Sequence, residues 1–178
     1  MVVLPRTKLS RRGFSLNVAA GLALASTSWA RASPRRVLFV IARSLNANVV
    51  HYEAQVSAPG ELDRLRPLVA YWVMHAEDGQ REELSWFERQ FAYGWSVVSR
   101  GEPQRVELRL IAFPQRSLVM RVDASGGVRA EVRILGRTTA LQRIFVQLAD
   151  GGGPTVRYID LFGTEISSGR ALRERVEP

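Results

Sequence analysis

Apolar and polar side chains alternate along three consecutive segments in the C-terminal half of this chain. Residues 106–112, 118–123 and 128–134 place an apolar side chain at every second position, with mostly charged side chains between. Successive side chains of a strand point to opposite faces of a sheet. The pattern predicts an antiparallel meander with one buried face and one charged face that carries cross-strand ion pairs. Phe113–Arg116 and Asp123–Gly127 are the expected turns.

Other β-prone segments extend this pattern to both sides of the meander. Asn-rich residues between the first two segments favour a hairpin turn. Together the segments predict about nine strands without a regular alternation of strands and helices. The segments are residues 36–43, 48–54, 68–75, 139–148 and 156–166.

One amphipathic segment, residues 82–91, reads as a short helix. Leu84, Phe87 and Phe91 fall on one stripe of a helical wheel, and Gly94 is placed to end the helix. We therefore expect a mainly β fold, in which an antiparallel meander forms either a barrel or a two-sheet sandwich with the helix plugging one end. The sequence does not separate the barrel from the sandwich.

The first 32 residues have the order of an export signal: basic residues, a mildly apolar run, and small residues before a cleavage site after Ala32. Within them, the segment Ser10–Leu16 contains Arg11 and Arg12 and resembles the twin-arginine translocation signal. This resemblance implies recognition by the twin-arginine translocase and cleavage by signal peptidase. The expected product is a single periplasmic or extracellular domain, residues 33–178, exported in the folded state.

The export signal also accounts for most of the net charge. Five of the 25 basic residues and none of the 17 acidic residues lie in residues 1–32, so the rest carries 20 basic and 17 acidic residues. We therefore expect no nucleic-acid partner, since such binding needs a clustered basic face. The apolar run at residues 14–25 is shorter than the roughly 20 residues that span a membrane, so we expect no membrane anchor.

Residue types and motifs exclude several classes of chemistry. The chain has no cysteine, which removes disulfides, thiolate nucleophiles and iron–sulfur ligation. No Gly-x-Ser-x-Gly motif occurs. We expect no cofactor, and no residue is assigned a catalytic role, which leaves enzymatic activity uncertain and a binding role favoured.

Polar and aromatic residues concentrate between residues 43 and 95, whereas the C-terminal half resembles a plain scaffold. Such residues are typical of a site that binds a small ligand or a cell-envelope partner, although the aromatic rings could equally build the core under the helix. The site is expected near the first hairpin and the helix. The candidate ligand-binding residues are Arg43, Asn46, Asn48, Tyr52, Trp72, Glu88, Arg89 and Tyr93.

Two alternatives stay open. His51 and His75, the only histidines, are weak metal-ligand candidates and with Glu88 could form a small hydrolase, either cofactor-free or with a single metal. No metal-binding spacing supports this alternative. A structural or assembly role in the envelope is the other, and it predicts a sizeable exposed apolar patch instead of a pocket.

Three segments, residues 43–52, 69–74 and 82–94, resemble an uncharacterised bacterial and protist family known only as a domain of unknown function. The likeness extends over most of the chain from about residue 37 onward, and it implies no activity. The positions that match the family pattern are Asn46, Asn48, Tyr52, Trp72, Glu88, Arg89, Tyr93 and Gly94.

Overall fold

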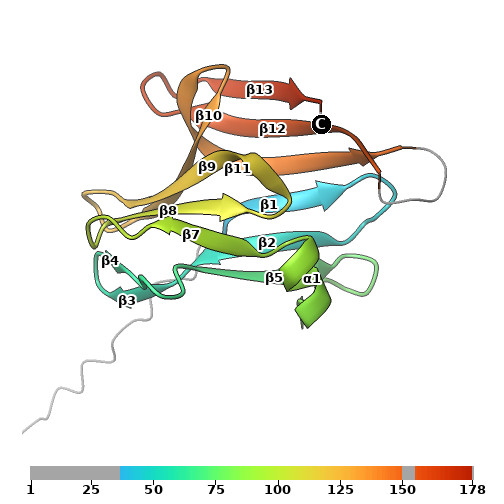
Figure 1. Cartoon of the computed structure of the whole chain (residues 1–178), viewed down its shortest axis with the longest axis horizontal. Helices are drawn as coiled ribbons and strands as arrows, with labels where there is room; N and C mark the ends of the chain where they lie inside the picture. Colours follow the sequence, from blue (N-terminus) through green and yellow to red (C-terminus); the bar gives the residue numbers. More distant parts are fainter. Residues whose placement is uncertain (1–36, 150–154, 178) are drawn as a thin grey trace, which may run out of the picture. The chain divides into compact units, whose positions relative to one another are not determined.

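A computed structural model describes residues 37–149 and 155–177, and these residues are mainly β-strands (Figure 1). The mainly β prediction is therefore confirmed. The expected export signal and the glycine-rich turn at residues 150–154 lie outside the described residues. The described elements are β1 (Val37–Arg43), β2 (Val49–Ala54), β3 (Val56–Ala58), β4 (Glu61–Leu62), β5 (Leu68–Met74), β6 (Gln80–Glu83), α1 (Trp86–Phe91), β7 (Trp95–Ser99), β8 (Arg105–Leu110), β9 (Phe113–Val122), β10 (Val128–Ile134), β11 (Arg137–Leu148), β12 (Val156–Glu165) and β13 (Ala171–Val176).

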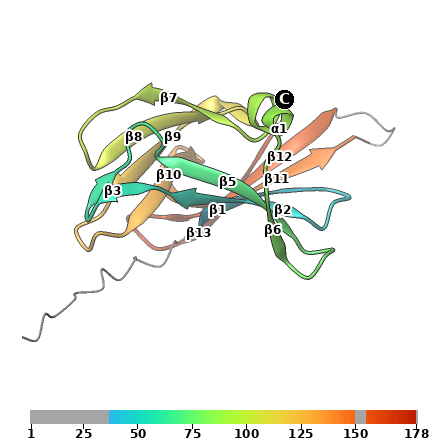
Figure 2. The ribbon, with the colours of Figure 1, turned by 90° about the horizontal axis from the view of Figure 1, so that it is seen from below.

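Eleven of the described strands form one mixed sheet, which branches at β11. The first residues of β11 pair with β10, and residues Arg143–Val146 pair with β1 in a parallel register. The opposite edge of β11 pairs with β12 along its length. The two arms, β1-β2-β5-β6 and β10-β9-β8-β7, curl toward each other as in a half-barrel (Figure 2). The sheet is therefore mixed and open, where the sequence favoured an antiparallel barrel or sandwich.

The core fills the space between the two arms. Phe39 and Tyr52 from one arm belong to the same buried cluster as Leu108 and Met120 from the other. The alternation in β8, β9 and β10 supplies this cluster, because every second side chain of these strands faces inward. The predicted meander is confirmed by the antiparallel pairs β8–β9 and β9–β10.

The turn expected at Phe113–Arg116 is wrong by a few residues. Phe113 is buried and already begins β9, so the turn occupies residues 111–112. Pro114 fits inside β9 because the β8–β9 register shifts between Arg109 and Leu110. The residues of β9 opposite this shift are not regularly paired with β8, so the missing backbone N–H of proline breaks no hydrogen bond between these two strands.

Acidic side chains on the face opposite to the core are held by arginines, as the charge alternation predicted. Asp160 lies between two core residues of β12 and is only 2% exposed. Arg175 and Arg173 of the neighbouring β13 donate to its carboxylate over 2.6–3.0 Å. Hydrogen bonds from these two arginines hold the pKa of Asp160 below its usual range despite burial.

Several strands carry no clear sequence signal. All four residues of β6 are exposed, so no apolar alternation marks it. Strand β13 lies at the edge of the sheet and buries none of its side chains fully. Their positions depend on pairing with β5 and β12, which contain the buried apolar residues that these strands lack.

The helix is shorter and more exposed than predicted. Ser85 caps it through a capping box with Glu88, so α1 begins at Trp86, and residues 80–83 join the sheet as β6. Leu84 is buried, but Phe87 and Phe91 are 65% and 62% exposed, so the expected buried stripe is wrong. In the described part of the chain no helix is long and apolar enough to cross a membrane.

Candidate functional site

Five of the eight candidate residues line one pocket of about 430 Å³, which we call the hairpin–helix pocket. It lies where the end of β1, the β1–β2 turn, β5, β6 and the start of α1 come together. Its volume falls within the range of small-molecule sites. The lining residues are Arg43, Asn46, Asn48, Trp72 and Glu88 from the candidate set, with Met74, Glu82, Glu83 and Ser85.

Arg43 is the cation of this pocket. It follows Phe39 and Ile41 at two-residue intervals and therefore points to the same inward face as those core residues. Its guanidinium carbon lies 5.5 Å from the ring centroids of both Trp72 and Tyr93. The Nε atom is buried without a hydrogen-bond partner, and within the described residues Arg43 forms no ion pair. An unpaired buried donor is costly, and a ligand acceptor would relieve this cost.

Glu88 connects the helix to the sheet. One carboxylate oxygen accepts the Nε1–H of Trp72 at 2.9 Å, and the other accepts from the backbone N–H and the hydroxyl of Ser85 at 2.8 Å. Burial by itself raises the pKa of Glu88, but the hydrogen bonds from Ser85 and Trp72 and the charge of Arg43 outweigh it and lower the pKa. Glu88 therefore remains ionised near neutral pH and orients the Trp72 ring in the pocket wall.

Asn46 and Asn48 shape the turn that borders the pocket. The side-chain oxygen of Asn46 accepts from the backbone N–H of Asn48 at 2.8 Å, which is a local turn bond typical of asparagine. The side-chain oxygen of Asn48 accepts from the backbone N–H of Ala76 at 3.2 Å and so ties this turn to the β5–β6 turn. Their side-chain amide N–H groups form no hydrogen bond within the described residues and can donate to a ligand.

The remaining three candidates lie elsewhere. Tyr52 is fully buried, stacks on Phe39 with ring centroids 4.5 Å apart, and donates to the backbone carbonyl of Tyr93 at 2.8 Å. Arg89 and Tyr93 line a neighbouring pocket of about 570 Å³, which shares Glu83 with the hairpin–helix pocket. Arg89 also forms an ion pair with Glu83 at 3.0 Å.

Tyr93 lines the neighbouring pocket and also contacts Trp72 and Arg43 of the hairpin–helix pocket. Its ring packs edge-on against Trp72, and its hydroxyl is buried without a hydrogen-bond partner in the part of the chain that the structure describes. Burial raises the pKa of Tyr93 to about 12, so the hydroxyl keeps its proton. It is therefore a second unused donor close to Arg43.

The structure does not bring the histidines to this pocket. His51 pairs with Tyr71, whereas the preceding residue of β2, Val50, pairs with Trp72, so His51 and Trp72 point to opposite faces of the sheet. Glu88, which contacts Trp72, is therefore on the other face from His51. His75 lies exposed in the β5–β6 turn. Burial and the charge of His75 lower the pKa of His51 more than Glu53 raises it.

Residues 37–149 and 155–177 contain no group of three or more His, Cys, Asp or Glu side chains that could hold a metal ion. The arrangement thus gives no support to the hydrolase alternative with His51 and Glu88.

Sequence reasoning missed four lining residues: Met74, Glu82, Glu83 and Ser85. One signal was present, because Ser85 and Glu88 have the spacing of a capping box and mark the start of a helix. Placing the helix start at Ser85 releases residues 80–83 to pair with β5, which carries Glu82 and Glu83 to the pocket rim.

Comparison with known proteins gives a family but no activity. Neither the curated proteins nor the solved structures contain a match to this chain. A family model does match, over residues 39–175, which include all the elements that form the hairpin–helix pocket. The chain therefore belongs to the family described as Domain of unknown function (DUF4833).

Proposed function

We propose that this chain is an exported binding domain that holds a small ligand in the hairpin–helix pocket, with Arg43 as the partner of an anionic group on that ligand. The observation that carries the proposal is the inward-facing Arg43, whose buried Nε lacks a partner among the described residues. Export through the twin-arginine route is part of the proposal and rests on the segment Ser10–Leu16.

The pocket walls restrict the ligand further. Trp72 and Tyr93 flank the guanidinium with ring faces, and the asparagine amides offer further donors. Glu82 and Glu83 lie at the rim and disfavour a ligand with several negative charges. A monocarboxylate or a zwitterion, such as a free amino acid or a short peptide, fits this balance best.

Replacing Arg43 by methionine is the direct test. Methionine keeps an apolar stem between Trp72 and Tyr93 but removes the guanidinium. We expect the affinity for a ligand found in a calorimetric panel of amino acids, dipeptides and monocarboxylates to fall by about tenfold or more, because a charge-assisted bond is lost. The free energy of unfolding should stay within about 1 kcal/mol of the parent, since the lost Nε–H has no protein partner.

Arg109→Met is the matched control, because Arg109 is exposed on β8 and lies outside the pocket. This variant should bind the same ligand with unchanged affinity. Unchanged binding in Arg43→Met would refute the proposed role of Arg43. Unfolding of that variant would instead assign Arg43 a structural role in packing the two rings.

A second candidate function, contact with an envelope partner, is favoured by an exposed aromatic cluster on α1. Trp86, Phe87 and Phe91 are 70%, 65% and 62% exposed, and the Phe91 ring contacts the other two rings. Exposed apolar side chains that group together are typical of interaction surfaces. The cluster borders the hairpin–helix pocket through Ser85 and Glu88, so a partner bound there would also affect ligand access.

The exposure of this cluster can be checked through stability. The double variant Phe87→Ser, Phe91→Ser should change the free energy of unfolding by less than about 1 kcal/mol, because neither ring is buried in the fold. Leu84→Ser, in a side chain only 3% exposed, should cost several times more. Thermal or urea unfolding measures both variants. Equal large losses would mean that α1 packs on the sheet and leaves no aromatic surface for a partner.

A further inference from the structure

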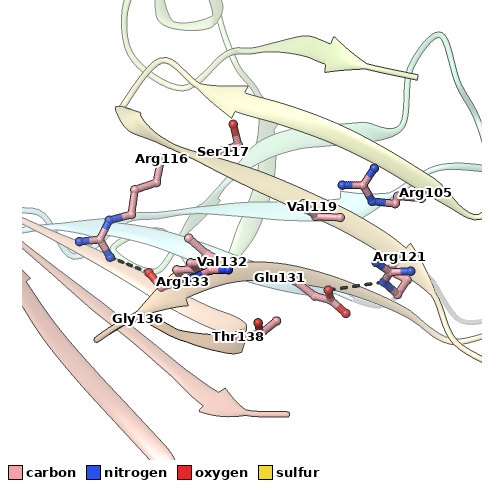
Figure 3. Close-up of a pocket in the computed structure, with 10 residues that line it drawn as sticks. All are labelled: Arg105, Arg116, Ser117, Val119, Arg121, Glu131, Val132, Arg133, Gly136 and Thr138. Carbon is pink, nitrogen blue, oxygen red and sulfur yellow. Dashed lines mark hydrogen bonds and ion pairs between the residues drawn. The ribbon is translucent and has the colours of Figure 1, made fainter. Parts of the chain in front are cut away.

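A second pocket, of about 790 Å³, lies on strands β8, β9, β10 and β11 and shares no lining residue with the hairpin–helix pocket (Figure 3). We call it the arginine pocket. Four guanidinium groups and two hydroxyl groups dominate its lining: those of Arg105, Arg116, Arg121, Arg133, Ser117 and Thr138. The sequence gives no local signal for this pocket, because its arginines are spread over 29 positions and separated by acids.

The four arginines form two groups. Arg105 and Arg121 are direct cross-strand partners in the β8–β9 ladder. At the other end of β9, Arg116 donates to the backbone carbonyl of Arg133 at 2.6 Å. Arg116 and Arg121 are five positions apart on one strand, which separates their backbone positions by roughly 16 Å at about 3.3 Å per residue. Figure 3 shows the hydroxyl-bearing Ser117 and Thr138 between these ends.

The acids around the pocket are already engaged. Glu131 is the one acidic side chain in the lining, and it forms ion pairs with Arg129 at 2.7 Å and with Arg121 at 3.5 Å. Glu174 takes two hydrogen bonds from Arg116, at 2.8 Å and 2.5 Å. Arg133 forms no ion pair within the described residues.

The polar groups of the arginine pocket that remain available to a ligand are therefore mainly hydrogen-bond donors. Each guanidinium carries five N–H groups, and a single carboxylate uses at most two of them in a bidentate pair. Arg105 contacts Glu107 only at 3.7 Å, so most of its N–H groups have no acceptor within the described residues. A ligand rich in acceptor oxygens is the complement of such a lining.

We propose that the arginine pocket binds an extended ligand that carries several phosphate groups. A single phosphate would engage only one of the two arginine groups, whereas a chain of phosphates reaches both and passes the hydroxyl donors between them. Arginine is suited to this role because its planar fork matches the phosphate oxygens. The same chemistry occurs in soluble linear polyphosphate and in the phosphodiester headgroups of a lipid surface, and the test separates these sources.

The test uses the full chain and two probes, inorganic polyphosphate in calorimetry and phosphatidylglycerol vesicles in a flotation assay. Orthophosphate serves as the single-phosphate comparison and should bind far more weakly than the chain. The double variant Arg105→Gln, Arg133→Gln should weaken binding of the preferred probe by about tenfold or more, since it removes one guanidinium from each group. Its melting temperature should stay close to that of the parent, because both side chains are at least partly exposed.

Arg66→Gln with Arg157→Gln is the matched control, because it removes the same two charges from exposed positions outside the arginine pocket. If only the Arg105→Gln, Arg133→Gln variant loses affinity for polyphosphate, the ligand is soluble. If only that variant loses affinity for the vesicles, the ligand is a lipid surface. Either result supports the proposal. Equal loss in the control, or no binding of either probe, overturns it. Neither outcome depends on Arg43, so the ligand of the hairpin–helix pocket is tested separately.

Discussion

Replacing Gly94 by alanine is expected to lower the free energy of unfolding by about 3 kcal/mol, as overpacking against a fixed neighbour does. A Cβ atom at this position would lie 1.8 Å from the backbone oxygen of Arg89 and 3.1 Å from the side chain of Ile111. The first contact is with the last turn of α1 and cannot be relieved by rotating a side chain. The chain must instead move away, which breaks the hydrogen bond from the Ile111 N–H to the Gly94 carbonyl.

Urea unfolding of the Gly94→Ala variant measures this loss. Gly101→Ala is the control, because a Cβ there would come no closer than 3.3 Å to its nearest neighbour and the residue is exposed. The control should lie within about 1 kcal/mol of the parent. Identical stability of both variants would mean that the chain does not turn tightly against α1 at Gly94. The turn also positions Tyr93, so a destabilised variant should lose the geometry of both neighbouring pockets.

The strands of the meander were predictable because each of them is buried on one face only. Each of β8, β9 and β10 has one face on the core and one face in solvent, so apolar and polar residues alternate along its sequence. Local information is sufficient in this case. The hairpin of β1 and β2 was equally accessible, because two apolar segments are joined by a short turn with asparagines.

The branch at β11 was not predictable from such local patterns. Its parallel pairing with β1 joins residues about one hundred positions apart, and nothing in either segment encodes the direction of the partner. The pattern of β1 is mostly apolar, which fits a strand in any central position of a sheet. The choice between barrel and sandwich depended on this one contact, and the structure resolves it as a curled, branched sheet.

The helix was misread because a helical wheel tests periodicity but not burial. Leu84, Phe87 and Phe91 have helical spacing in the sequence, yet only Leu84 is buried, and it precedes the helix. The capping box at Ser85 was the stronger signal, since it satisfies backbone donors that only a helix start leaves free. Six residues are too few to bury a full stripe against the sheet.

The candidate site was predictable in part for a related reason. Arg43 shares the two-residue phase of Phe39 and Ile41, so alternation by itself places a cation on the inward face. Asparagines in the adjacent turn and Trp72 on the strand paired with β2 then have to lie nearby. Tyr52 also points inward, but it is fully buried in the core. The alternation of side chains shows which face a residue is on, not how deeply it is buried. It therefore could not distinguish a ligand contact from a core residue at this position.

Tyr52 should therefore behave as a core residue, and its alanine variant should lose about 4 kcal/mol of unfolding free energy, as large aromatic truncations in a core do. The ring is fully buried and stacks on Phe39. Tyr52→Phe keeps the ring and removes one hydrogen bond, to the carbonyl of Tyr93, so it should cost only about 1 kcal/mol. Tyr158→Ala is the matched control, because that ring is only partly buried on the opposite face, under Arg175.

Urea unfolding of the three variants separates packing from recognition at Tyr52. A loss with alanine that is several times the loss with phenylalanine means that the ring acts by filling the core. Small and equal losses, with ligand affinity abolished, would contradict the buried position and return Tyr52 to the binding site. The phenylalanine variant also reports on the pocket, because the lost bond fixes the Tyr93 backbone beside Arg43. A modest fall in ligand affinity in this variant, without a change in the core, would show that the pocket depends on a residue that no ligand can touch.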